Sequence, residues 1–259
     1  MGDETPSVDV IPDDVIGPER TFRQMFNLFF APEIERRQSA GLLPRPFEVQ
    51  KAQVLFVEGR PPEVRLNDEV TIRLIIEASG AKQPGDVIGD GEIENIEAFE
   101  LELADSDAGH FTILPWKGEW RMLFDFRKNK GKAANLVKRA EEFLTVSEHA
   151  FAQNLFGPYI DNLFSACELL AKARLITAAA VAPSIKTHPA IQSRINQWGR
   201  LGNVDGAFVE TFNKLSRARS AARYSAEDVS MLSDAEHLAT ARAEGTDLKK
   251  RLSRFGDEG

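Results

Sequence analysis

Cysteine is almost absent from this sequence, with Cys167 as its single example among 259 residues. One cysteine cannot form an intrachain disulfide, and it cannot supply a cysteine-rich zinc site. The composition therefore predicts a protein of a reducing compartment, and we expect it to be cytoplasmic. Cys167 falls within an apolar helical stripe, where a buried thiol is expected to be inert.

Long apolar runs are absent too. The most apolar stretch, RLITAAAVAP (174–183), is much shorter than the roughly 20 residues that a membrane helix needs. The first residues, MGDETPSVDVIPDD, are acidic and have neither a basic start nor an apolar core. We therefore expect no signal peptide and no association with a membrane.

Histidine is scarce and scattered. The four histidines are each more than one helical turn from the next: His110, His149, His188 and His237. The sequence has no HExxH or His-x-His pattern and no G-x-S-x-G nucleophile elbow, so we predict no metal ion, no cofactor and no catalytic residue. The glycine-rich stretch GDVIGDGE (85–92) carries three acidic residues that would repel phosphate, which indicates a loop between strands.

Basic residues are outnumbered, with 32 Lys and Arg against 40 Asp and Glu, giving a formal net charge of −8. The imbalance is uneven, because residues 1–132 carry 16 basic and 25 acidic side chains, whereas residues 133–259 carry 16 and 15. Any contact with a polyanion such as RNA is therefore expected to be local and to involve the second half of the chain.

Hydrophobic periodicity predicts an α+β fold that begins with a β-rich part. Residues 1–17 are acidic and show no apolar period, which indicates a flexible tail. Residues 18–45 predict short helices with an aromatic face. Over residues 46–127, apolar residues alternate in short runs separated by turn-forming residues, which predicts an antiparallel, β-sandwich-like domain.

The pattern changes after the basic stretch RKNKGK (127–132), which is the predicted junction. Residues 133–255 have a helical period throughout and predict an all-α bundle of about five helices. A stop-and-restart signal at Gly157-Pro158 predicts that the first long helix ends there and the second begins.

An arginine cluster stands out within this helical part, in RARSAARY (217–224). On a helix Arg219 and Arg223 share a face, while Arg217 lies about 120° away from Arg223. One interpretation is a solvated face whose arginines pair with acidic neighbours such as Glu210 and Glu227. The other is a phosphate-binding site, because forked guanidinium groups suit phosphate oxygens.

The helical half resembles the HEPN domain, a helical family of prokaryotic toxins, defence proteins and CRISPR-associated ribonucleases. The similarity lies in the small-and-apolar helix YIDNLFSACELLAKARLI, in KTHPAIQSRINQW, and in the segment around RARSAARY. Family members commonly have Arg-x-x-Ala-Asp-Tyr in that last segment. Arg219, Ala222 and Tyr224 match this pattern, while Arg223 replaces its aspartate.

The resemblance implies phosphate binding rather than catalysis. Active members place a histidine four to six residues after an arginine, and in dimers the two line a groove where the histidine assists attack by the RNA 2′-hydroxyl. No histidine in this sequence follows an arginine at that distance, and Ala222 stands where a toxin-type member has histidine.

We therefore predict a non-catalytic HEPN-like protein that binds nucleic acid, a nucleotide or a protein partner in bacterial defence or a toxin–antitoxin system. The expected binding residues are Arg217, Arg219, Arg223 and Tyr224. Two alternatives stay open: a structural protein that only dimerises through its helical domain, and a metal-independent HEPN ribonuclease with a rearranged site. In the predicted binding protein, the β domain is expected to serve recognition or docking.

Overall fold

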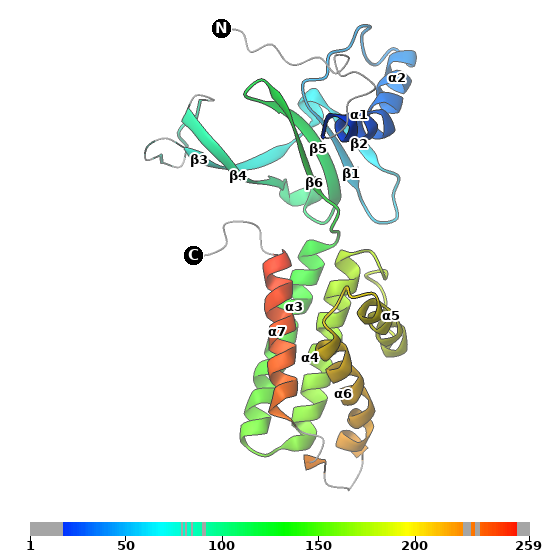
Figure 1. Cartoon of the computed structure of the whole chain (residues 1–259), viewed down its shortest axis with the longest axis vertical. Coiled ribbons are helices and arrows are strands. Elements are labelled where there is room, and N and C mark those ends of the chain that lie inside the picture. Colours follow the sequence, from blue (N-terminus) through cyan, green and yellow to red (C-terminus); the bar gives the residue numbers. More distant parts are fainter. Residues whose placement is uncertain are drawn as a thin grey trace. The chain divides into compact units, whose positions relative to one another are not determined.

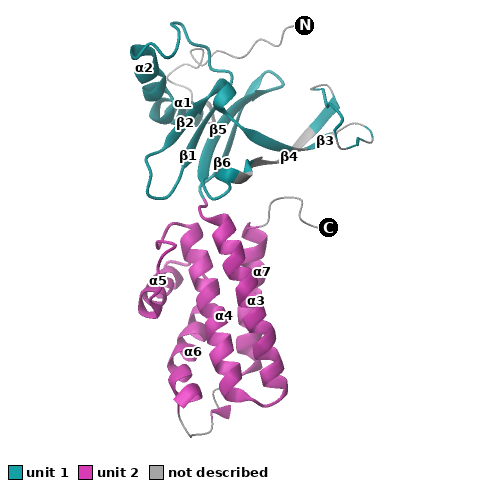
Figure 2. Cartoon of the chain, turned by 180° about the vertical axis from the view of Figure 1, so that it is seen from behind, with its two compact units in different colours: residues 1–126 teal, residues 127–259 magenta. Residues whose placement is uncertain are grey.

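The computed structural model (Figure 1) describes residues 18–252 apart from 79, 81, 84, 90–91, 225–228 and 231–233. The predicted tail, residues 1–17, lies outside the described residues. The chain divides into two compact units, residues 1–126 and 127–259 (Figure 2). Antiparallel strands in the first unit and helices in the second confirm the predicted mixed α and β composition.

The first unit combines two helices with six strands in its described part. In chain order these are α1 (Pro18–Phe29), α2 (Ala31–Ser39), β1 (Ala52–Phe56), β2 (Glu63–Leu66), β3 (Ile72–Ala78), β4 (Ile93–Leu101), β5 (Gly109–Trp116) and β6 (Glu119–Asp125). All pairs are antiparallel. Four strands form one sheet in the order β2-β1-β5-β6, and β3 pairs with β4 in a separate two-stranded sheet.

The core of the first unit lies between the two short helices and the four-stranded sheet. Phe22 and Phe30 are buried against residues of the central strands, including Phe111. The rings of Phe30 and Phe111 stack with 5.9 Å between their centroids, and the ring centroids of Phe22 and Trp120 are 5.6 Å apart. The aromatic face predicted for residues 18–45 is therefore part of a core, which explains why so polar a segment folds onto the sheet.

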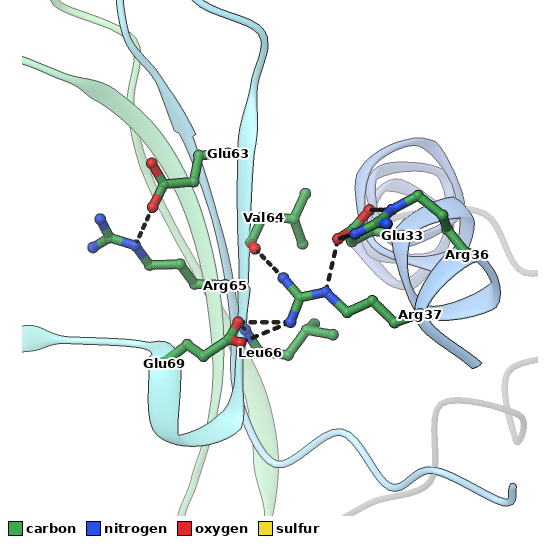
Figure 3. A network of polar contacts seen from close by, with 8 residues as sticks. All are labelled: Glu33, Arg36, Arg37, Glu63, Val64, Arg65, Leu66 and Glu69. Atoms are coloured by element: carbon green, nitrogen blue, oxygen red, sulfur yellow. Dashed lines mark hydrogen bonds and ion pairs between the residues drawn. The ribbon is translucent and has the colours of Figure 1, made fainter. Parts of the chain in front are cut away.

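A polar network ties α2 to the edge of this sheet (Figure 3). Arg37 donates to Glu33 at 2.7 Å, to both carboxylate oxygens of Glu69 at 2.8 Å, and to the carbonyl oxygen of Val64 at 2.8 Å. Glu69 also accepts a hydrogen bond of 3.0 Å from the backbone N–H of Leu66. Arg37 thus connects a helix, a strand and the turn that follows the strand.

We expect Arg37→Ala to lower the free energy of unfolding of the first unit by about 1–2 kcal/mol, because it leaves the Glu69 carboxylate without its cation. Arg36→Ala is the matched control, since its side chain is 62% exposed whereas that of Arg37 is 16% exposed. Denaturant unfolding in a Trp198→Phe background leaves two tryptophans, both in this unit, as fluorescent reporters. Equal decreases in the free energy of unfolding for Arg37→Ala and Arg36→Ala would contradict the prediction.

The second unit is formed by five helices over its described residues. They are α3 (Lys130–Ala152), α4 (Phe156–Thr177), α5 (His188–Arg200), α6 (Gly206–Tyr224) and α7 (Ala235–Leu252). The first of these ends at Ala152, before the predicted stop at Gly157-Pro158, because the chain turns at Asn154 with a positive φ of 56°. Gly157 and Pro158 instead lie in the first turn of α4.

Helix α4 lies at the centre of the second unit and contacts each of the other four helices. It is apolar on most of its circumference, as expected for a helix surrounded by others. Cys167 of this helix is fully buried, and burial raises the pKa of its thiol, in agreement with the inert cysteine predicted from the sequence. None of the helices in the described part of the chain has both the length and the apolar character to cross a bilayer.

Candidate functional site

Helix α6 carries all four predicted binding residues but does not bring them to one place. Arg219 and Arg223 both bond to Asp161 of α4. Arg217 instead lines cavities that α6 forms with α5 and with α7. Tyr224, the last residue of the helix, is 82% exposed. Helical periodicity explains this division, because Arg217 projects from a different face than the other two arginines.

Asp161 receives both arginines on its single carboxylate. Arg223 binds it with two hydrogen bonds, from Nε to Oδ1 at 2.6 Å and from Nη2 to Oδ2 at 2.8 Å. Arg219 adds a third from its Nε to Oδ1 at 3.2 Å. Partial burial would raise the pKa of Asp161, but these hydrogen bonds hold that pKa below its usual range. Two cations on one anion leave this cluster with a net positive charge.

Arg219 and Arg223 have an acidic partner that the sequence did not suggest, whereas Glu210 interacts electrostatically with Arg217. Glu210 bonds to Lys214 at 2.9 Å, one turn along the same helix. Glu227 lies outside the described residues. The partner of Arg219 is Asp161, which is 58 residues away in the sequence. Local spacing contains no signal for such a contact, since it depends on how two helices pack.

A glycine sets the close approach of α4 to α6 at this site. A Cβ atom added to Gly157 would lie 2.9 Å from the carbonyl oxygen of Ala222, too close for any larger residue without movement of the backbone. Asp161 follows Gly157 by one helical turn, so it faces the same part of α6. Gly157 therefore helps to bring the carboxylate within reach of Arg219 and Arg223.

The ring of Phe164, on α4, packs against Arg219. This ring stacks on Phe212 at 5.5 Å between centroids, and the Cζ atom of Arg219 lies 4.6 Å from its centroid. This distance is typical of a cation–π contact. The ring of His188, at the start of α5, lies 5.8 Å from Phe164, and its Nδ1 contacts the carboxylate of Glu168. The fold thus places a histidine beside the arginine cluster, which local spacing did not reveal.

A second charged cluster is buried between α4 and α7. Arg174 bonds through Nε to Glu244 Oε1 at 2.5 Å and through Nη2 to Asp247 Oδ2 at 2.5 Å. Only 6% of Arg174 and 5% of Glu244 is exposed. Arg174 of α4 bonds to both carboxylates of α7, so this cluster joins the two helices. No group of three or more metal-binding side chains occurs among the described residues.

Comparison with known proteins adds no relative: no protein-family model matches the chain, and no curated protein matches it. The HEPN resemblance therefore rests on the sequence motifs given above and stays a prediction. What can be argued about function comes from the geometry of α4, α6 and their neighbours.

Proposed function

We propose that residues 133–255 form a non-catalytic HEPN-like domain that binds single-stranded RNA through Arg219, Arg223 and Tyr224, in a cytoplasmic bacterial defence or toxin–antitoxin system. The observation that carries this proposal is the convergence of two arginines on the single carboxylate of Asp161. The proposal includes a HEPN-type arrangement of the helices and a sandwich-like first unit that serves recognition. Both of these rest on the sequence patterns.

The charge of the cluster favours an anionic ligand. If its role were only to hold α4 against α6, one arginine would be enough to neutralise Asp161. A guanidinium group has five N–H donors, and the bonds from Arg223 to Asp161 involve two of its three nitrogens. Phosphate oxygens are suited to the remaining donors. Because Asp161 already orders both side chains, binding would cost less conformational entropy than with unrestrained arginines.

Tyr224 indicates which kind of anion is bound. Its ring is 82% exposed and follows Arg223 directly, so it contributes little to the core of the unit. Single-stranded nucleic acids are bound where basic side chains contact the backbone and an aromatic ring stacks on a base. An arginine pair with an adjacent exposed tyrosine combines these two features.

Cleavage is not part of the proposal. Ala222 stands where a toxin-type member of the family has its histidine, and its methyl group cannot transfer a proton. One observation favours the ribonuclease alternative, namely that His188 and Arg219 contact the same phenylalanine ring. Glu168 engages the Nδ1 atom of His188 and leaves its Nε2 atom available, but no arginine lies four to six residues before His188, as it does in active family members. We therefore favour binding over catalysis.

Fluorescence anisotropy with a labelled single-stranded RNA and the full chain tests the proposal. We expect the dissociation constant to rise with salt concentration. Arg219→Ala and Arg223→Ala should each reduce the slope of log Kd against log salt concentration by about one, because each removes a phosphate contact. Tyr224→Ala is expected to weaken binding by about 1–3 kcal/mol, because it removes base stacking.

Arg194→Ala is the matched control, since Arg194 is an exposed arginine of α5 that bonds to Gln197 within its own helix. It should leave both affinity and salt slope close to those of the unchanged chain. Absence of RNA binding at low salt would overturn the proposal and favour the purely structural alternative. RNA fragments on a denaturing gel, lost in Arg219→Ala, would support the ribonuclease alternative instead.

A further inference from the structure

Strand β6 forms one edge of the four-stranded sheet, and β2 forms the other. Proteins usually protect such edges, because the outward backbone groups of an edge strand can pair with another chain. The edge of β2 is covered by the network of Figure 3, in which Arg37 binds the carbonyl oxygen of Val64 and Glu69 binds the N–H of Leu66. Among the described residues, no backbone hydrogen bond joins β6 to a segment other than β5.

The turn before β6 determines which of its backbone groups point to the open edge. Lys117 and Gly118 form a two-residue turn with φ angles of 51° and 77°. The residues that flank such a turn form a hydrogen-bonded pair, and along the strands these pairs alternate with pairs that are not hydrogen-bonded. Counting from Glu119, the first residue after the turn, the odd-numbered residues of β6 bond to β5. The N–H and C=O groups of Met122 and Phe124 therefore point to the open edge.

Aromatic side chains are exposed at the same edge. Phe124 is 62% exposed and Phe126 is 53% exposed, and their rings stack with 5.7 Å between centroids. Phe124 projects from the same face of the sheet as Trp120 and Met122, which pack against the core of the first unit. Stacked rings that continue a core to an unpaired strand edge are typical of a surface that another chain covers.

The sequence of β6 is complementary to itself. When two copies of β6 lie antiparallel about a two-fold axis at Leu123, Arg121 is opposite Asp125 of the second copy, and Met122 is opposite Phe124. Opposite charges thus pair on one face of the sheet and apolar side chains pair on the other, and both kinds of pair stabilise adjacent strands. Met122 and Phe124 are also the residues whose backbone groups point outward, so this register forms a regular ladder.

The two neighbouring registers that keep this ladder fit less well. An axis at Met122 places Glu119 opposite Asp125, and like charges directly opposite each other are destabilising. An axis at Phe124 places Asp125 opposite Leu123, which leaves the carboxylate without a cation. The pattern of charges therefore selects one register for a second copy of the same strand.

We infer that β6 is a dimerisation edge, at which two copies of this chain pair antiparallel about Leu123 and join their four-stranded sheets. This dimer differs from the one predicted through the helical domain, because β6 belongs to the first unit. It is also independent of the proposed RNA binding, for which Arg219 and Arg223 of the second unit are responsible.

Cysteine cross-linking of the full chain tests the register. In an antiparallel pair that is not hydrogen-bonded, the Cα atoms lie about 4.5 Å apart, which a disulfide can span. Leu123→Cys is therefore expected to form an intermolecular disulfide under mild oxidation, visible as a dimer on a non-reducing gel. Arg121→Cys is the matched control, because its two copies would be four residues out of register, or roughly 13 Å apart. Cys167 is buried and does not compete.

Sedimentation velocity over a concentration series, without RNA, measures the association itself. We expect a dimer whose dissociation constant rises about tenfold in Arg121→Glu, because two attractive charge pairs become repulsive. Arg60→Glu is the control, since Arg60 is an exposed arginine between β1 and β2 and the variant has the same change in net charge. It should leave the dissociation constant of the dimer unchanged.

The inference is overturned if the chain sediments as a monomer at every concentration, or if Arg121→Cys cross-links as efficiently as Leu123→Cys. A dimer that Arg121→Glu weakens no more than Arg60→Glu does would form through another surface, such as the helical domain, and would also overturn it. Failure of the RNA-binding proposal would leave all of these results unchanged, because no RNA is present in either experiment.

Discussion

Replacing Arg174 with alanine is expected to lower the free energy of unfolding of the second unit by about 3–5 kcal/mol. Arg174 and Glu244 are both buried and are joined at 2.5 Å, and Arg174 also bonds to Asp247. Removing the guanidinium leaves the Glu244 carboxylate buried without a cation. A buried unpaired charge is among the few single changes that cost this much.

The loss should depend on pH in a defined direction. Burial raises the pKa of Glu244 above 4.5, and Arg174 opposes that increase. A carboxyl group whose pKa is raised on folding contributes stability that is present below pH 4.5 and is lost as the pH rises through its folded pKa. Without Arg174 the pKa of Glu244 in the folded state rises further. The difference in free energy of unfolding between Arg174→Ala and the unchanged chain should therefore grow as the pH increases through the folded pKa of Glu244.

Urea unfolding followed by far-UV circular dichroism at acidic and neutral pH measures both effects. Arg251→Ala is the matched control, because Arg251 bonds to the same Asp247 at 2.7 Å but is 60% exposed. Arg251→Ala should lower the free energy of unfolding by less than about 1 kcal/mol. The double variant Arg174→Met with Glu244→Leu removes both buried charges and should recover most of the loss. A cost for Arg174→Ala no larger than that for Arg251→Ala would show that the buried pair is not stabilising.

The parts of the fold that depend on local pattern could be predicted from the sequence. The apolar spacing within residues 18–29 predicted a helix with an aromatic face; Phe22 is buried in the core of the first unit, and Met25, Phe26 and Phe29 are partly buried against that core. The alternation of apolar residues predicted antiparallel strands. The apolar stripe of Cys167 predicted a buried thiol. In each case neighbours in the sequence determine which side of an element is apolar.

Contacts between distant segments could not be predicted in this way. The order β2-β1-β5-β6 places β1 beside β5 and leaves β3 and β4 as a separate pair, which no turn signal indicates. At the candidate site, Arg219 was identified from its own helix, but Asp161, Phe164 and His188 come from α4 and α5. Such contacts follow from how helices pack, and a single sequence carries no record of them.

Phe164→Ala is expected to lower the free energy of unfolding of the second unit by about 3–5 kcal/mol, because it removes a ring from a filled core. Phe164 is 2% exposed and contacts Phe212, His188 and Arg219. Thermal unfolding of the full chain, followed by far-UV circular dichroism, measures this loss. It cannot by itself separate the core role of Phe164 from its contact with Arg219.

Phe164→Leu separates the two roles, since leucine fills much of the space but has no aromatic face for the guanidinium. We expect this variant to stay folded and to bind single-stranded RNA about 2–10-fold more weakly than the unchanged chain. Phe151→Leu is the control, because Phe151 contacts Tyr159 at 4.9 Å and makes no ring contact with the arginines. If Phe164→Leu binds RNA as tightly as Phe151→Leu, the ring has no part in orienting Arg219. RNA binding would then depend on Arg223, whose two hydrogen bonds to Asp161 do not involve Phe164.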